Sequence, residues 1–214
     1  MKTALIGASG FIGSALLKEL LNRGHKVTAI VRHPEKITLR HKNLRVARGD
    51  VLNFHDAPIL LAGFDAVISA YNPGWKNTEA YENTINAYTS IIHAVKKVGI
   101  RRLLVVGGAG SLEDSPGIQL IDTGMFPAQL KPFVTGLRDV LALLNKENEL
   151  EWSFLCPSIN IETGARTGKF RLGKDQVIKD KQGVSKISLE DYAMAMIDEL
   201  ETPKYIRQRF TVGY

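Results

Sequence analysis

Short apolar runs alternate with longer stretches of helical periodicity along the chain, and this alternation limits the possible folds more than any other feature. Runs such as 3–6 and 103–106 are apolar at every or nearly every position, which is typical of strands buried on both faces of a parallel sheet. Between the runs, apolar residues recur three and four positions apart, as in amphipathic helices. We expect strands near residues 3–6, 27–31, 44–47, 65–69, 103–106, 152–155 and 209–212, and helices near 12–20, 54–62, 87–98, 137–144 and 189–200.

These elements predict a doubly wound α/β domain, because strands that are apolar on both faces need helices on both sides of their sheet. We predict one Rossmann-like domain over residues 1–214, a length that can bury a core without disulfides or metals. The stretch 157–187 is less regular and holds four glycines with seven basic and three acidic residues. Long segments of this kind often serve as binding loops, so we expect a lid on the substrate side. Residues 188–191 (Ser-Leu-Glu-Asp) resemble a capping box that opens the last helix.

A glycine turn separates the first predicted strand from the first predicted helix. Residues 7–13 read Gly-Ala-Ser-Gly-Phe-Ile-Gly, with a serine where the common dinucleotide fingerprint has its second glycine. Such a turn lets the backbone approach a pyrophosphate, and the helix N-terminus offers N–H groups to its charge. An ordinary tight turn is the alternative, but the strand–turn–helix context favours dinucleotide binding. We expect the pyrophosphate to contact Gly7, Ala8, Ser9, Gly10, Phe11 and Ile12.

The second predicted strand ends in a cation, at the position where an NAD-binding protein would carry an acidic residue. Arg32 occupies this position, and His33 and Lys36 follow it. An arginine cannot accept hydrogen bonds from ribose hydroxyls, but it can bind a 2′-phosphate through two parallel hydrogen bonds. A hydrogen bond to a charged group contributes about 1.5–3 kcal/mol, which predicts roughly a tenfold to hundredfold preference for NADP(H) over NAD(H). A solvated arginine is the alternative.

Residues that follow the other strands complete the predicted site, because ligands of such sheets bind beyond the carboxyl ends of the strands. Asp50 could accept a hydrogen bond from an adenine amino group or cap the following helix, and the sequence leaves both roles open. Two glycines after the fifth strand suit the close approach of a flat ring. We expect the rest of the dinucleotide to contact Asp50, Val51, Ser69, Ala70, Tyr71, Gly107, Gly108, Ala109, Pro157 and Ser158.

The chain lacks the Tyr-x-x-x-Lys pair with which short-chain dehydrogenases donate a proton to the substrate oxygen. None of its six tyrosines is followed four positions later by a lysine. Alcohol–ketone chemistry therefore loses its usual acid, whereas hydride transfer to a flavin or quinone does not need one. Ser111 is a weak catalytic candidate that could contact the substrate, or simply be a loop serine.

Several other residue types suggest less. The five histidines show no metal-ligand spacing, so we predict no metal site. Cys156, the single cysteine, fits a small buried side chain and a reducing, cytoplasmic location. Phe126, Tyr71 and Trp75 could wall an aromatic pocket, or merely pack.

The net charge of +6 has one source in the sequence. Residues 23–48 hold eight lysines and arginines against one glutamate. A basic patch can bind nucleic acid, but this one lacks interleaved aromatics and any known reading module. We therefore expect it to attract a polyanionic cofactor and predict no nucleic-acid partner. No apolar run approaches the roughly 18 residues of a membrane span, so no membrane partner is expected, and the oligomeric state is left open.

Several segments together resemble the NADH-flavin reductases, a family of atypical short-chain dehydrogenase/reductases, and the resemblance covers essentially the whole chain. The architecture is also similar to that of biliverdin/flavin reductases and NmrA-like regulators. By analogy with the former, the resemblance implies that Ser111 faces the substrate and Arg32 faces the 2′-phosphate. The segments are residues 7–13, 31–32, 49–51, 106–112, 166–170, 173–175 and 188–193.

Two functions are consistent with these observations. In the first, NADPH reduces a small-molecule acceptor such as a flavin (FMN or FAD), a quinone or a similar conjugated compound, which stacks beneath residues 157–187. In this case Arg166, Lys169, Arg171 and Lys174 could meet an acceptor phosphate, or be a solvated loop. In the second, the protein binds NADP(H) without turnover and signals its redox state, as NmrA-like proteins do.

Overall fold

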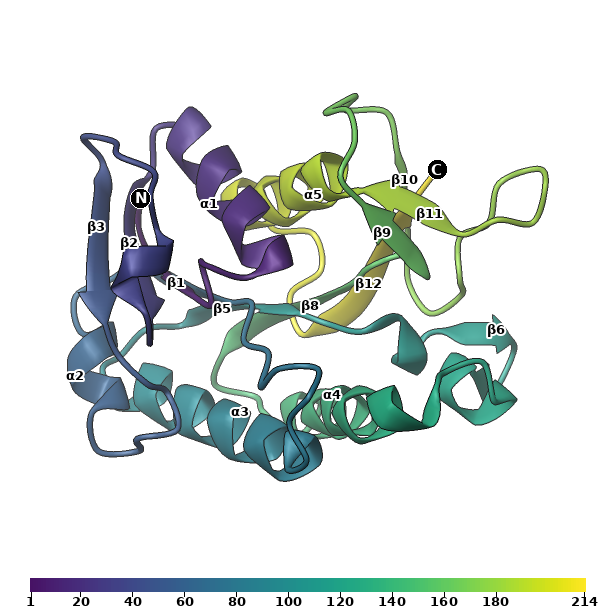
Figure 1. The fold of residues 1–214 in the computed structure, drawn as a ribbon, viewed down its shortest axis with the longest axis horizontal. Coiled ribbons are helices and arrows are strands. Elements are labelled where there is room, and N and C mark those ends of the chain that lie inside the picture. Colours follow the sequence, from purple (N-terminus) through teal and green to yellow (C-terminus); the bar gives the residue numbers. More distant parts are fainter.

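The computed structural model describes residues 1–214, which form a central eight-stranded sheet (Figure 1). The strand order is β10-β12-β8-β5-β4-β1-β2-β3, and all neighbouring strands are parallel except β10, which runs antiparallel to β12. The strands are β1 (Lys2–Ile6), β2 (Lys26–Val31), β3 (Leu44–Arg48), β4 (Ala66–Ser69), β5 (Arg102–Val106), β8 (Glu151–Cys156), β10 (Arg171–Gly173) and β12 (Gln208–Gly213).

Helices cover both faces of this sheet, which confirms the predicted fold class. Helices α1 (Phe11–Asn22) and α5 (Leu189–Glu201) pack on one face, and α2 (Ala57–Leu61), α3 (Ala80–Lys97) and α4 (Lys131–Leu144) cover the other (Figure 1). Each face has its own apolar core, centred on residues such as Leu16 and Met196 on one side and Tyr88 and Leu141 on the other. No helix is long and apolar enough to cross a membrane.

The segment 157–187 is more ordered than the sequence predicted. It contains β9 (Asn160–Glu162), β10 and most of β11 (Lys186–Ser188), and β11 pairs with β9 in a separate two-stranded sheet. The sequence also missed the short antiparallel pair β6 (Glu113–Ser115) and β7 (Ile118–Gln119) and four short 3-10 helices, at Pro34–Lys36, Ala109–Ser111, Leu120–Thr123 and Ala128–Leu130. These elements are too short to show a periodicity of their own.

The strand order reverses beside β1, which pairs with β2 on one side and β4 on the other. In open α/β sheets, ligands bind in the crevice at the carboxyl ends of the strands at such a switch point. The turn after β1 and the ends of β2, β4 and β5 therefore position the candidate site.

Candidate functional site

The turn between β1 and α1 requires glycine at Gly7, and the first turn of α1 requires it at Gly13. Gly7 has a φ of +77°, and a Cβ atom there would lie 2.4 Å from the backbone oxygen of Ala70. A Cβ on Gly13 would lie 2.0 Å from the backbone oxygen of Gly7, so the first turn of α1 lies directly against the turn. No side chain caps the N-terminus of α1, and its first turn holds no acidic residue. This N-terminus can therefore receive an anion.

A pocket of about 560 Å³ lies over this turn and the strand ends beside it, a size typical of small-molecule and cofactor sites. Most of the predicted cofactor-binding residues line it: Gly7, Ser9, Gly10, Phe11, Ile12, Arg32, His33, Lys36, Asp50, Val51, Ala70, Tyr71, Gly107, Gly108, Ala109, Pro157 and Ser158. Ala8 and Ser69 do not, since both are fully buried. The fold thus gathers residues from six separate stretches of the chain at one site.

One end of the pocket carries its only charged side chains. Arg32 is exposed at the end of β2, and its guanidinium makes no hydrogen bond or ion pair with the protein. Lys36 is likewise unpaired, whereas His33 lies 3.1 Å from Glu35. Asp50 accepts a hydrogen bond from the backbone N–H of Leu52 at 3.0 Å. It therefore closes a local turn and does not cap α2, which begins seven residues later.

The loop after β5 forms the floor near the centre of the pocket. A Cβ on Gly107 would lie 2.3 Å from the Phe154 ring, so this position also requires glycine. Arg209 on β12 holds the far end of the loop, because its guanidinium donates to the backbone oxygen of Ser111 and pairs with Asp175. The loop is therefore a fixed surface on which a flat ring can rest.

Ser111 does not face the pocket, contrary to the role that the resemblance implied. Its side chain is buried and donates to the backbone oxygen of Gly108 at 3.1 Å, with the Cys156 sulfur 3.4 Å away. The 3-10 turn at residues 109–111 directs this hydroxyl inward. Ser111 thus shapes the loop and does not reach a ligand in this arrangement.

The pocket offers no strong proton donor to a substrate. Tyr71 is the only tyrosine that lines it, and burial raises the pKa of its hydroxyl to about 12. Tyr71 packs edge-to-face against Tyr88, with ring centroids 6.3 Å apart. The structure also shows no group of three or more histidine, cysteine, aspartate or glutamate side chains that could hold a metal.

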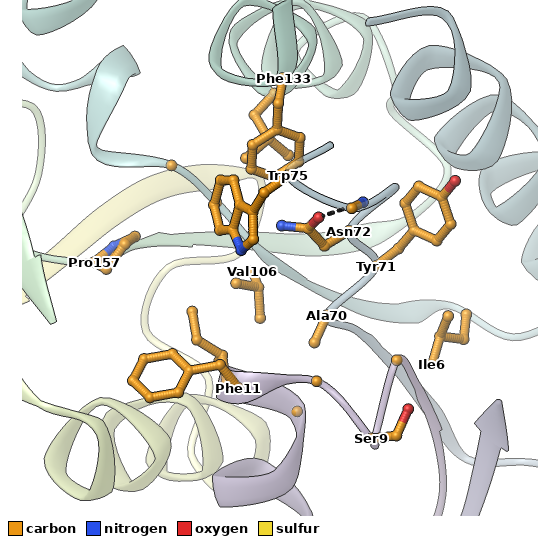
Figure 2. Close-up of a pocket in the computed structure, with 18 of the residues that line it drawn as sticks. Ile6, Ser9, Phe11, Ala70, Tyr71, Asn72, Trp75, Val106, Phe133 and Pro157 are labelled. Carbon is orange, nitrogen blue, oxygen red and sulfur yellow. Dashed lines mark hydrogen bonds between the residues drawn. The ribbon is translucent and has the colours of Figure 1, made fainter. Parts of the chain in front are cut away.

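The other end of the pocket is apolar and aromatic (Figure 2). Phe11 and Trp75 lie on opposite sides of the space in front of Val106, and Trp75 packs edge-to-face on Phe133 with ring centroids 5.3 Å apart (Figure 2). Of the aromatics that the sequence left open, Tyr71, Trp75 and Phe126 all line the pocket. The sequence places Leu137 in a helix core and does not single out the other apolar contributors, which are Leu130, Phe133, Val134, Ile159 and Ile161.

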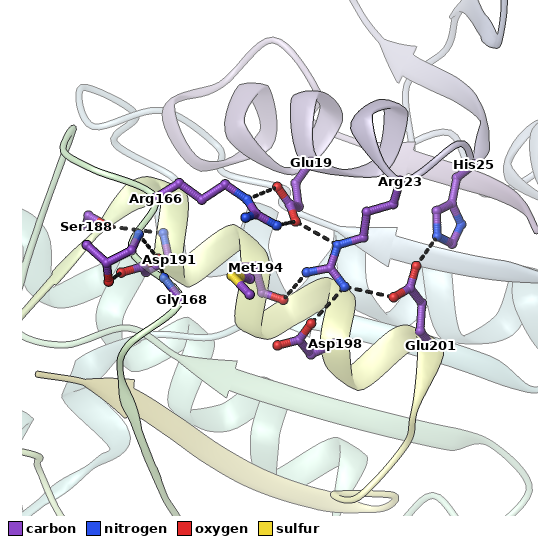
Figure 3. A network of polar contacts seen from close by, with 11 residues as sticks. Glu19, Arg23, His25, Arg166, Gly168, Ser188, Asp191, Met194, Asp198 and Glu201 are labelled. Atoms are coloured by element: carbon purple, nitrogen blue, oxygen red, sulfur yellow. Dashed lines mark hydrogen bonds and ion pairs between the residues drawn. The ribbon is translucent and has the colours of Figure 1, made fainter.

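The basic residues of segment 157–187 do not line this pocket. Arg166 instead forms two hydrogen bonds with Glu19 on α1, at 2.8 and 2.9 Å (Figure 3). Arg23 binds the same carboxylate at 2.7 Å and also pairs with Asp198 and Glu201 on α5. The bond from Arg166 lowers the pKa of Glu19, although burial opposes it. These cations join the segment, α1 and α5.

Comparison with known proteins identifies this architecture. Residues 7–203 match the model of the NAD(P)H-binding family. The chain belongs to the NAD(P)H-binding family. The matched range includes the glycine turn, Arg32 and the apolar end of the pocket.

Solved structures of other proteins superpose closely on this chain. One, described as a "putative epimerase" from Bacteroides thetaiotaomicron, is 51% identical with a TM-score of 0.93, covering 100% of this chain and 96% of that one. Another, a "putative NADH-flavin reductase" from Streptococcus pneumoniae, is 34% identical with a TM-score of 0.85, covering 100% and 99%. The Bacillus subtilis protein YwnB is 38% identical over 99% of this chain and 98% of its own length.

Proposed function

We propose that the protein is an NADPH-dependent reductase that transfers hydride to a flavin, a quinone or a similar conjugated acceptor. The observation that carries this proposal is the division of the pocket into two unlike ends. One end presents an unpaired Arg32, and the other is aromatic and lacks a proton donor. The membership of the chain in an NAD(P)H-binding family supports the cofactor.

The preference for NADPH rests on Arg32. An exposed guanidinium that has no partner in the protein can bind a 2′-phosphate without first breaking an ion pair. Lys36 lies in the following 3-10 turn and adds a second unpaired cation to the same end of the pocket. No carboxylate stands at the end of β2 to accept hydrogen bonds from the ribose of NADH.

The acceptor class follows from the missing acid. Bound NADPH would supply a hydride, and a flavin or quinone can take it without a protein acid because solvent protonates the reduced product. Tyr71 is poorly suited to act as this acid, since burial raises its pKa to about 12. The protein's part is to orient two rings, with Gly107 and Gly108 forming the floor and the aromatic side chains covering the ring faces.

The missing acid also favours one other function, a redox sensor that binds NADP(H) without turnover. Such a sensor must bind the oxidised and reduced cofactor with different affinities, because a ligand without a preference shifts no equilibrium. Segment 157–187 would then be its readout, whereas in the reductase it would be a lid on the acceptor.

One experiment separates these functions. NADPH is mixed with the protein and then with riboflavin, FMN, FAD or a panel of quinones, and the absorbance of the reduced nicotinamide is followed. The reductase predicts a catalytic fall in absorbance with at least one acceptor. No fall with any acceptor, together with unequal affinities for NADPH and NADP⁺, would support the sensor and overturn the reductase.

A further inference from the structure

We propose that the apolar end of the pocket is the acceptor site and that it selects an uncharged planar ring over a phosphorylated flavin. A quinone or the isoalloxazine of riboflavin has the required chemistry. This inference rests on the proposed function and narrows it, because that function alone admits FMN and FAD as readily as uncharged rings.

The shape of this end suits a flat ligand. Phe11 and Trp75 present aromatic surfaces on opposite sides of the space, with Val106 behind it and Pro157 at its margin (Figure 2). Phe11 is 54% exposed and Trp75 is 62% exposed, so neither ring is consumed by the core. Aromatic faces stack favourably on flat conjugated rings, and such a ligand would cover both exposed side chains.

The distribution of charged side chains in the pocket is the basis of the proposed selectivity against phosphorylated flavins. All charged residues in the pocket lining (Arg32, Lys36 and Asp50, with His33 beside them) lie on or after β2 and β3, at the adenosine end. The lining contributed by residues 70–75, 106–110, 126–137 and 157–161 contains no lysine, arginine, aspartate or glutamate. A phosphate placed there would lose hydration without gaining an ion pair, which is costly.

The few polar side chains at this end are already engaged. The Ser158 hydroxyl donates to the backbone oxygen of Val212 at 2.8 Å. The Asn72 side-chain oxygen accepts from the backbone N–H of Gly74 at 2.7 Å, which leaves its amide N–H groups as donors. Asn72 can therefore donate to a carbonyl oxygen of a quinone or an isoalloxazine, which adds orientation but no charge.

The neighbouring cations do not change this balance. Arg166 is held by Glu19, and the exposed Lys76 and Lys131 lie outside the lining although each adjoins a lining segment. Charges at such exposed positions are screened by solvent and salt. We therefore expect them to contribute a small, salt-sensitive attraction at most.

Trp75 lies in a turn at the edge of the site, and we expect its indole to position the bound ring. Gly74, which precedes it, has a φ of +105°. The only aromatic ring that packs against the indole is that of Phe133. The second tryptophan, Trp152, is 1% exposed in the core. A change in the exposed tryptophan fluorescence therefore reports on Trp75.

Binding can be tested without turnover. The protein saturated with NADP⁺, which carries no hydride to transfer, is titrated with riboflavin and with FMN by calorimetry, and with an uncharged benzoquinone by tryptophan fluorescence. We expect riboflavin to bind several-fold more tightly than FMN. An FMN affinity equal to or above that of riboflavin would overturn the proposed selectivity.

Variants locate the site. Trp75→Ala should weaken the binding of riboflavin, measured by calorimetry, about three- to tenfold, and Trp75→Phe should restore most of it. Phe54→Ala, at an exposed aromatic outside the pocket, should change nothing. Equal affinities in wild type and Trp75→Ala, or no binding of either ring, would overturn the acceptor site. If the rings bind as expected but NADPH is never consumed, the reductase fails and the binding site stands.

Discussion

Arg32 and Arg166 have opposite surroundings, and the comparison distinguishes a cation that is available to a ligand from one that stabilises the fold. Arg32, at the end of β2, lines the pocket and has no protein partner. Arg166, in segment 157–187, is tied by two hydrogen bonds to the buried Glu19 and lies outside the pocket. The sequence makes each of them a possible phosphate ligand. The structure shows that an unpaired cation beside a pocket is available to a ligand, whereas a paired one holds the fold.

The pocket region and the region around segment 157–187 differ in the same way, in whether their polar groups have partners within the protein. In the pocket region, three hydrogen-bonding features have no partner in the protein. They are the N-terminus of α1, which no side chain caps, and the side chains of Arg32 and Lys36. The region around segment 157–187 uses its groups internally. Asp191 on α5 accepts a bond from the backbone N–H of Gly168 at 2.9 Å (Figure 3). It also accepts from the backbone N–H of Thr167 at 2.8 Å and from the hydroxyls of Thr167 and Tyr214.

Disturbing the glycine turn should have the largest effect on the pocket region. Gly7→Ala places a Cβ 2.4 Å from the backbone oxygen of Ala70, so the turn or the wall opposite must move. Loss of one or two hydrogen bonds to the pyrophosphate would reduce NADPH affinity about a hundredfold or more, measured by calorimetry. Gly24→Ala is the matched control, because Gly24 has nearly the same φ, +80°, with open space around it. It should cost about 1 kcal/mol of stability and leave NADPH affinity unchanged; equal losses of affinity in both variants would contradict this explanation.

Removing Asp191 should have the largest effect on the other region. Asp191→Ala removes the shared acceptor of four hydrogen bonds, from Thr167, Gly168 and Tyr214. It should lower the free energy of unfolding by about 3 kcal/mol or more, while Asp191→Asn keeps part of the network and should lose less. Burial opposes ionisation, but bonds from Thr167, Gly168 and Tyr214 lower the pKa of Asp191. The ionised carboxylate therefore stabilises the fold at pH values above about 4, the usual aspartate pKa. This stabilisation is lost as the pH falls from there through the lowered pKa. Denaturant unfolding should therefore show a difference between wild type and Asp191→Asn at pH 7 that shrinks as the pH falls below about 4. A difference that is independent of pH would contradict the role of the charge.

Arg32→Ala should act on the cofactor alone. We expect NADPH affinity to fall about tenfold to a hundredfold, with NADH affinity and thermal stability unchanged. Arg40→Ala, in the same basic stretch but outside the pocket lining and without an ion pair, should alter NADPH affinity by less than about threefold through long-range attraction. Similar losses in the two variants would mean that general charge, and not a specific contact, attracts the cofactor.

Arg166→Ala should have the smallest effect. The Arg166 side chain is 48% exposed, and Glu19 keeps its bond to Arg23 when Arg166 is removed. The free energy of unfolding should fall by less than about 1 kcal/mol, with no change in the NADPH to NADH affinity ratio. Lys169→Ala, at an exposed cation without an ion pair, is the control and should leave stability unchanged. A shift in the cofactor ratio of Arg166→Ala would break the contrast with Arg32.

Local patterns were sufficient to predict the sheet and most of the cofactor-binding end. The seven predicted strands lie within one or two residues of those observed, because most of them are apolar runs buried on both faces. The turn at Gly7 and the cation at Arg32 are also local, since each is fixed by its position after one strand. Ser188 caps α5 as predicted, accepting from the backbone N–H of Asp191 at 3.1 Å.

Contacts between distant segments could not be predicted in the same way. The capping box implied that Asp191 would bond back to its own helix, but its carboxylate turns to Thr167 and Gly168, more than twenty residues earlier. The resemblance implied that Ser111 faces the substrate, but its hydroxyl donates to the backbone oxygen of Gly108 and lies beside the Cys156 sulfur on β8. The apolar wall on α4 has ordinary helical spacing, so only the packed structure distinguishes its pocket-facing residues from its core.

The affinities of the unaltered protein for NADPH and NADH test the central claim most directly. Both are measured by calorimetry in one buffer at low and at moderate salt. The unpaired Arg32 predicts that NADPH binds roughly tenfold to a hundredfold more tightly than NADH, and that the preference persists when salt screens distant charges. Equal affinities, or tighter binding of NADH, would contradict it.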